Sequence, residues 1–151
     1  MNKKNQKRKM FGIVALVIVA VSIVALFIRI DNWSRDFSTN YAKLDPAARD
    51  MNLRPMTFTD PLDVVIEKIE KWVQSQPHWE VVEKTASESS AQLHLTRTTS
   101  LMRYTDDIHV DLTAQGGGTW MEAESKSRVG KGDLGQNPRN LKELLAALRL
   151  M

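Results

Sequence analysis

The hydrophobic and polar positions change pattern twice along the chain, and the first pattern is an uncharged block near the N-terminus. This block runs for eighteen residues, from Phe11 to Ile28. As an α-helix it would extend roughly 27 Å, close to the hydrocarbon thickness of a bilayer. A helix buried in a soluble core is a poor alternative, because the block has no polar face. The pattern predicts a transmembrane anchor over residues 11–30.

Basic residues are concentrated on one side of this block. Only Arg29 follows it directly, whereas five cations precede it: Lys3, Lys4, Lys7, Arg8 and Lys9. Because flanking Lys and Arg stay on the cytoplasmic side, we predict a cytoplasmic tail at residues 1–10 and a periplasmic C-terminal part, in a single-pass protein of the bacterial inner membrane. A cleaved signal peptide is the alternative, but no cleavage site of small residues follows the block.

The second pattern is irregular, and the third is periodic. Residues 31–59 carry isolated apolar positions without a period, which predicts a linker. At Asp60-Pro61 a helix begins, and it ends before Pro77. Its apolar positions recur every three or four residues: Leu62, Val65, Ile66, Ile69, Trp72 and Val73.

Four segments of alternating apolar and polar residues follow, which is typical of strands. They are Trp79–Lys84, Ala91–Thr98, Thr105–Ala114 and Thr119–Ser127. Turn-forming residues separate the first pair at 87–90 and the last pair at Gly116-Gly117-Gly118.

A glycine-rich loop, Val129–Gln136, leads to a final helix that we expect to begin at Asn137-Pro138. The apolar stripe of this helix is Leu141, Leu144, Leu145, Leu148 and Met151. The order helix, four strands, helix predicts an α+β domain over residues 60–151. Its economical architecture is a four-stranded antiparallel sheet with both helices on one face.

Charge and composition narrow the classes of function. The chain has a formal charge of +3, but residues 31–151 carry 15 Lys and Arg against 18 Asp and Glu, or −3. Without a basic surface on the folded part, nucleic acid is excluded as a partner, and anionic lipid headgroups are disfavoured. The absence of Cys excludes disulfides, thiol catalysis and thiolate zinc sites.

Two histidines are the first candidates for chemistry. If the second and third strands form a hairpin, His94 lies opposite His109, and apolar residues such as Leu95 and Ile108 also match. The open sheet face would then collect His94, His109, Asp111, Glu122 and Glu124. Such a group can hold zinc or move protons, but solvated polar residues on a wet strand face are the ordinary interpretation. We therefore expect no metal or other cofactor, with His94, His109 and Glu124 as weak metal candidates.

The second candidate is the loop before the last helix. Its glycines, its cations and the helix N-terminus favour an anion, although the spacing fits no nucleotide-binding pattern. In the alternative, Asp133 and Asn137 bond backbone groups and Arg128 pairs with a carboxylate, so that the loop is fixed on the sheet.

The runs Arg103-Tyr104-Thr105-Asp106-Asp107-Ile108, Ser127-Arg128-Val129-Gly130, Asp133-Leu134-Gly135 and Asn137-Pro138-Arg139 resemble the motifs of the family catalogued as domain of unknown function 1499. The resemblance covers about residues 60–150 and implies no assigned activity. Lys126 and Leu134 stand where Ser and Phe are usual in the family. An Asn-Cys-Val-Ser-like stretch that is common near the family's N-terminus is absent, and neither histidine belongs to the motifs.

These observations predict a membrane-anchored binding or scaffolding module of the cell envelope, which contacts an envelope protein or a small anionic ligand. The expected contact residues are Asp106, Asp107, Arg128, Lys131, Asp133, Asn137 and Arg139. The alternative is a metal- or carboxylate-dependent envelope hydrolase that uses Asp106, Asp107, Asp133 and Arg128. An enzyme is the less favoured prediction, since no nucleophile pattern surrounds any serine.

Overall fold

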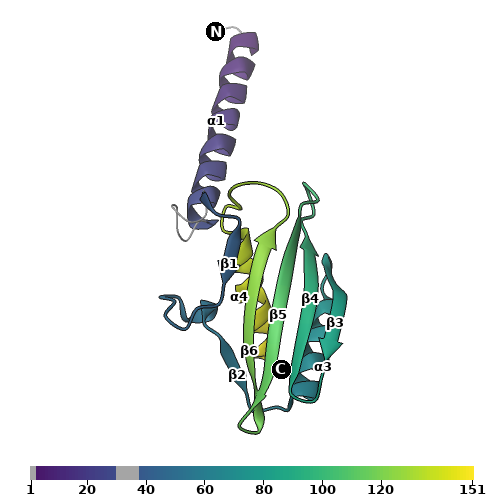
Figure 1. Cartoon of the computed structure of the whole chain (residues 1–151). Helices are drawn as coiled ribbons and strands as arrows, with labels where there is room; N and C mark the ends of the chain where they lie inside the picture. The colour runs from purple at the N-terminus through teal and green to yellow at the C-terminus, as the bar shows by residue number, and fades with distance from the viewer. Residues whose placement is uncertain (1–2, 30–37) are drawn as a thin grey trace.

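A computed structural model of the chain describes residues 3–29 and 38–151, with side chains for residues 10–25 and 38–151. The first element is a 27-residue helix, α1 (Lys3–Arg29), which precedes an α+β domain (Figure 1). In the described part of the chain, no helix is both long and apolar enough to cross a membrane. Ile30, the last residue of the predicted anchor, and residues 31–37 of the predicted linker lie outside the described residues.

The sheet of the domain is antiparallel and has six strands, so the prediction of four was wrong. The strands are β1 (Tyr41–Lys43), β2 (Met56–Phe58), β3 (Trp79–Ala86), β4 (Ser90–Thr98), β5 (Thr105–Gln115) and β6 (Gly118–Ser127). Their order is β1-β6-β5-β4-β3, and β2 also pairs with β6 (Figure 1). The additional strands lie on one edge of β6, where Ala42 pairs with Ser125 and Thr57 with Trp120.

Both additional strands come from the segment predicted to be a linker. Each has three residues, too few for an alternating pattern to be recognised. A 3₁₀ helix, η1 (Met51–Leu53), lies between them, and Leu44, Leu53 and Phe58 are buried in the core of the domain. The described part of this segment therefore completes an edge of the sheet.

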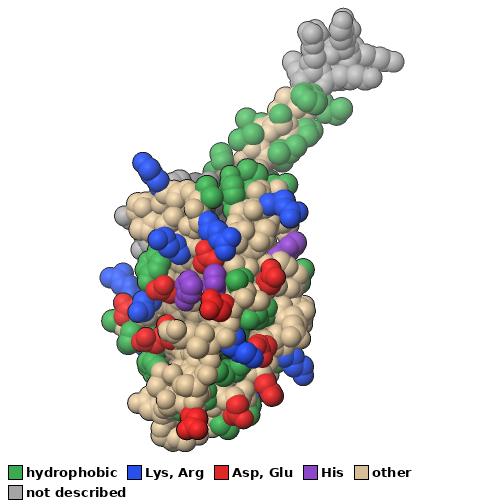
Figure 2. All heavy atoms as spheres, turned by 45° about the vertical axis from the view of Figure 1, so that its right-hand side comes forward, with side chains coloured by type: hydrophobic (Ala, Val, Ile, Leu, Met, Phe, Trp, Pro, Cys, Tyr) green, Lys and Arg blue, Asp and Glu red, His purple; other side chains and the backbone are tan. Residues whose placement is uncertain are grey.

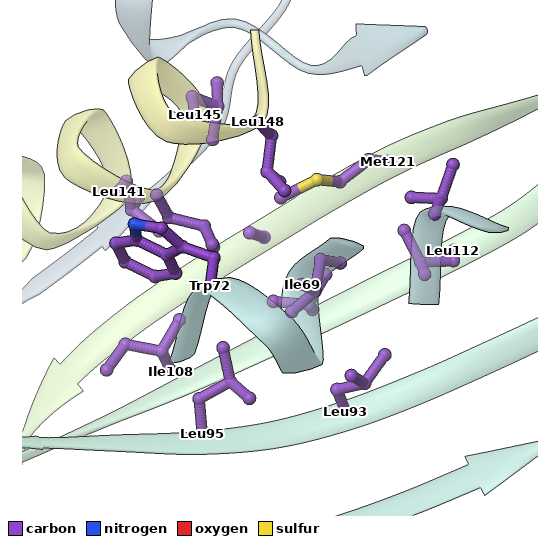
Figure 3. Packing of buried hydrophobic residues seen from close by; sticks show 14 of the residues in the cluster. Ile69, Trp72, Leu93, Leu95, Ile108, Leu112, Met121, Leu141, Leu145 and Leu148 are labelled. Carbon is purple, nitrogen blue, oxygen red and sulfur yellow. The ribbon is translucent and has the colours of Figure 1, made fainter. Parts of the chain in front are cut away.

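The two helices of the domain, α3 (Leu62–Ser75) and α4 (Gln136–Leu148), lie on one face of the sheet, as predicted (Figure 1). Figure 3 shows Ile69 and Trp72 of α3 and Leu141 of α4 facing the inner side chains of the strands. Trp72 also meets Trp79 edge-on, with ring centroids 4.8 Å apart. These contacts form one hydrophobic core.

Both helix starts differ slightly from the prediction. Pro61 is the N-cap of α3 rather than its first residue. The N-cap of α4 is Gly135, whose φ of 75° is left-handed, so this helix begins one residue before Asn137. Met151 lies beyond the end of α4 and is exposed, so it is not part of the apolar stripe.

The strand register is confirmed. His94 pairs with His109 across β4 and β5, and the flanking apolar pairs match as expected. The turn at Gly116 and Gly117, which have φ values of 60° and 86°, places Glu124 opposite His109. This register directs apolar side chains to the helices and leaves the other face polar.

At the edge opposite β1 and β2, β3 pairs with β4 alone within the described sheet. The pairing of β3 is interrupted by an irregularity between Val81 and Glu83. Its exposed residues include Glu80, Glu83 and Lys84, and the Lys84 ammonium lies 2.6 Å from a carboxylate oxygen of Glu70 on α3.

Candidate functional site

The inner face of the sheet changes from apolar to polar where β5 begins and β6 ends. Along β5, Asp106 takes the inward position that Ile108 and Val110 occupy further on. The first turns of α4 cover this region. The buried polar side chains here, which we call the polar cluster, are Asp106, Ser125, Ser127, Asn137 and Asn140.

The buried carboxylate of Asp106 is hydrogen-bonded at both oxygens. Ser127 Oγ donates to Oδ1 over 2.6 Å, and Asn140 Nδ2 donates to Oδ2 over 2.8 Å. Because a buried carboxylate is tolerated only when its oxygens find donors, these two residues allow Asp106 to join β5, β6 and α4. Both acceptor oxygens have protein partners, so the group is suited to holding elements together.

Asn137 is the centre of the polar cluster. Its Oδ1 accepts a hydrogen bond of 2.6 Å from Ser125 Oγ, and its Nδ2 donates to Ser127 Oγ over 2.9 Å. The same amide nitrogen donates to the backbone oxygen of Asn40 over 2.8 Å and also to the Asp133 carboxylate. One side chain therefore connects α4, β6, the loop before α4 and the residue before β1.

Asp133 fixes the loop between β6 and α4. Its Oδ1 accepts from the backbone N–H of Gly135 over 2.9 Å, and its Oδ2 accepts from that of Asn137 over 2.7 Å. A carboxylate in this position satisfies free N–H groups of the helix start and is favoured by the helix dipole. Leu134 and Gly135 both have left-handed backbone conformations, with φ of 51° and 75°. The Arg139 side chain donates to the Leu134 carbonyl over 3.0 Å.

The next residue of β5, Asp107, points to the opposite, open face of the sheet. Arg128 holds its carboxylate with two hydrogen bonds of 2.8 and 2.7 Å, and His94 Nε2 lies 2.8 Å from Oδ1. The Arg128 guanidinium, with a smaller contribution from His94, lowers the pKa of Asp107 to about 2. The bonds of Asp133 and the ion pair of Arg128 are those that the structural interpretation of the loop predicted.

His94 contacts this ion pair, and His109 lies against His94. Figure 2 shows His side chains among acidic and basic side chains on this side of the domain. The rings of His94 and His109 stack with centroids 4.6 Å apart. They border a shallow hollow of about 390 Å³, whose other lining residues are Glu83, Thr85, Gln92, Leu93, Val110, Asp111 and Glu124.

The carboxylates near the histidines have other partners. Glu124 accepts a hydrogen bond of 2.8 Å from Tyr41, and Asp111 accepts one of 2.9 Å from Gln92. Burial, together with Glu124, raises the pKa of the Tyr41 hydroxyl to about 12. Among the side chains that the structure describes, no group of three or more His, Asp or Glu is arranged to hold a metal ion.

The predicted contact residues therefore do not form one surface. Asp106, Asp133 and Asn137 are bonded inside the domain, Asp107 and Arg128 pair on the open face, and Lys131 is exposed in the loop. Arg139 reaches back to the loop from α4.

The predicted contact residues did not include Asn40, Ser125 or Asn140, which also belong to this arrangement. A signal existed for Asn140, since it lies three residues after Asn137 and next to Leu141 in the apolar stripe, where a polar residue needs a buried partner. Asn40 carries no such signal, because it lies in an irregular stretch.

A model of the family described as Protein of unknown function (DUF1499) matches residues 32–148. The chain belongs to the DUF1499 family. The DUF1499 match confirms the resemblance in the motifs and extends it to the segment that contains β1 and β2. No curated protein matches the chain. In this DUF1499 protein, the motif residues supply three members of the polar cluster, Asp106, Ser127 and Asn137. They also form the capped loop and the ion pair of Asp107 with Arg128.

Proposed function

We propose that this DUF1499 protein is anchored in the bacterial inner membrane by α1 and presents its domain outside the cytoplasm as a binding or scaffolding module. The observation that carries the anchor is the surface of α1. Every described side chain of this helix, from residue 10 to 25, is exposed, and most are large and apolar (Figure 2). A helix that is apolar on all sides is unfavourable in water and stable in lipid.

The sequence supports the same anchor. The uncharged run continues past the described side chains to Ile28, and five cations precede it. The domain buries its own apolar residues in one core and does not use α1 to complete it.

A scaffold is favoured over a hydrolase because the carboxylates of the motif are already bonded to other groups of the protein. Asp106 and Asp133 bond to groups of the protein itself, and Asp107 pairs with Arg128. With a pKa of about 2, Asp107 stays ionised near neutral pH and is poorly suited to general acid or base catalysis there. A second hollow, of about 540 Å³, is lined by residues that include Pro61 and Gly117 and by no residue of the family motifs.

The open face is the surface that we assign to a protein partner. Its strand positions carry more acidic than basic residues: Glu80, Glu83, Asp107, Asp111, Glu122 and Glu124 against Lys43 and Lys126, and Arg128 follows directly after β6. This charge favours a partner with a basic surface over a small anionic ligand.

Alkaline carbonate extraction of membranes that contain the full chain tests the anchor. We expect the protein to remain in the pellet. Leu16→Asp combined with Val19→Asp should release it, because each charge costs about 3 kcal/mol near the middle of a membrane helix. Leu16→Ala with Val19→Ala is the matched control and should stay in the pellet. Release of the unmodified chain would show that the anchor is wrong.

A photocrosslinking residue at Asp111 tests the open face, with the same residue at Glu67 on the exposed side of α3 as the control. We expect a discrete adduct from position 111 and none from position 67. In a second experiment the crosslinking residue is placed at position 92. Asp111→Lys combined with Glu122→Lys should then abolish the adduct with the partner. Equal yields of adduct from positions 111 and 67 would show that the open face is not a specific binding surface.

A further inference from the structure

Four segments meet at the end of the sheet where β1 begins, and we call this the proximal end. It consists of residues 38–40, which precede β1, residues 76–78 between α3 and β3, the β4–β5 hairpin at 99–104, and the β6–α4 loop at 128–135. Figure 1 shows the hairpin and the loop at the end of the sheet where the chain enters from α1.

The proximal end exposes large apolar side chains on two neighbouring segments. Leu101 and Met102 at the tip of the hairpin are 90% and 61% exposed, and Val129 and Leu134 in the loop are 63% and 41% exposed. Together with Tyr104, they are half of the ten exposed large hydrophobic residues of the described domain. Exposed apolar residues gathered in this way are typical of an interaction surface.

Charge is also divided between the ends of the domain. The proximal end carries Arg103 and Lys131, and also Arg128, which pairs with Asp107; its acidic residue Asp133 is bonded to backbone N–H groups. The far end carries Asp60, Asp63 and Glu88. In Figure 2, Lys and Arg side chains lie toward the upper part and Asp and Glu reach the lower end. Although residues 31–151 have a net charge of −3, the proximal end is therefore cationic.

The length of the connecting chain brings this end close to a bilayer that contains α1. Nine peptide units separate Arg29, the last residue of α1, from Ser38, and they can reach at most about 30 Å. Since Ser38 belongs to the proximal end, the connecting chain keeps this end within reach of a bilayer that contains α1.

We propose that the proximal end docks on the bilayer surface, with Leu101, Met102, Val129 and Leu134 in the interfacial region and Arg103 and Lys131 at anionic lipid phosphates. Apolar side chains beside cations are the combination that binds such surfaces. This inference rests on the proposed anchor. It also gives the polar cluster a role, because Asp133 and Asn137 hold the loop in the shape that presents Val129, Lys131 and Leu134.

The absence of Cys makes single-site labelling of the full chain possible. A fluorophore is placed at Leu101→Cys in the hairpin, at Gln115→Cys at the far end, and at Ala20→Cys in α1. Each labelled protein is reconstituted in vesicles of phosphatidylethanolamine and phosphatidylglycerol that contain a lipid-borne quencher. We expect strong quenching at positions 20 and 101 and at least several-fold weaker quenching at 115.

The three positions separate the two proposals. If position 20 is quenched and position 101 is no more quenched than 115, the anchor stands and docking is wrong. If position 20 is not quenched, the anchor itself is wrong, and docking fails with it.

A second measurement tests the role of anionic lipid. Arg103→Glu with Lys131→Glu should lower quenching at position 101 toward the level at 115, whereas Lys43→Glu with Lys71→Glu should leave it high. Unchanged quenching in the first pair would overturn the headgroup contact.

Discussion

At the scale of single residues, the buried amide of Asn137 has more structural partners than any charged group of the motif. It bonds to side chains or backbone of four residues, which are Asn40, Ser125, Ser127 and Asp133. Removing it leaves several of these groups buried without their partner. The free-energy cost of one unsatisfied buried polar group is about 1–3 kcal/mol.

We predict that Asn137→Ala lowers the free energy of unfolding by about 2–3 kcal/mol, measured by urea denaturation of the full chain in detergent. The matched control is Asn52→Ala, because Asn52 is exposed and its side chain accepts a hydrogen bond from the exposed Arg149, while its backbone bond to Asp50 is kept in the variant. The control should change stability by about 0.5 kcal/mol or less. Equal effects of the two changes would contradict a central role for Asn137.

Asp107 gives a prediction about pH. Its pKa is lowered to about 2 in the folded protein, below the ordinary value of 3.8, so folding favours the ionised carboxylate. The stabilisation is complete above about pH 4 and is lost as the pH falls through 2. In Arg128→Ala the pKa should rise toward 3.8, as an NMR titration of the side-chain carboxyl would detect. Lys131→Ala changes a cation of the same loop without touching Asp107, so it should leave the pKa near 2.

The sequence was enough to predict which types of bond hold the loop, but not every residue that takes part in them. Asp133 at a helix start and Arg128 near acidic residues are local signals, and their bonds were expected. The division between Asp106, directed inward, and Asp107, directed outward, follows from strand alternation once the register is known. Asn40 depends on a tertiary contact across the sheet edge, and nothing local predicts that contact.

At the scale of elements, the length of each strand determined whether it could be predicted from the alternation of apolar and polar residues. The four strands of eight or more residues have enough alternation to be predicted, whereas β1 and β2 have three residues each and depend on β6 for their conformation. The start of α3 moved by one residue and that of α4 by two, because Pro61 and Gly135 cap through their backbone geometry rather than through a side chain.

Gly118, the first residue of β6, tests how β2 is held. A Cβ atom there would lie 2.1 Å from the backbone oxygen of Phe58, so an alanine forces β2 away from β6. We predict that Gly118→Ala lowers stability by about 1–3 kcal/mol and increases amide hydrogen exchange at Phe58.

Gly116→Asn is the control for this change. The position has open space and a positive φ that Asn tolerates, so β2 should remain protected from exchange. Loss of protection at Phe58 in the control would mean that the turn, and not the contact with Phe58, determines the pairing of β2.

At the scale of the whole molecule, the distribution of charge predicts orientation. If the five cations before residue 11 keep the N-terminus in the cytoplasm, changing all of them to Ser should leave a substantial fraction of molecules inverted. Protease digestion of spheroplasts measures this, because it cuts the domain only when the domain lies outside. Changing the four lysines to Arg keeps the charge and should preserve the orientation. An unchanged digestion pattern in the Ser variant would show that these cations do not set the orientation.

The free edge of β3 has a consequence for molecules held side by side. Confinement to a plane in one common orientation raises the effective concentration at which sheet edges of neighbouring copies meet. An uninterrupted edge would invite strand pairing between copies. The irregularity after Val81 and the exposed charges of Glu80 and Glu83 break the regular row of backbone groups and make two such edges repel. If the chain is anchored as proposed, these features of β3 protect neighbouring copies against pairing edge to edge.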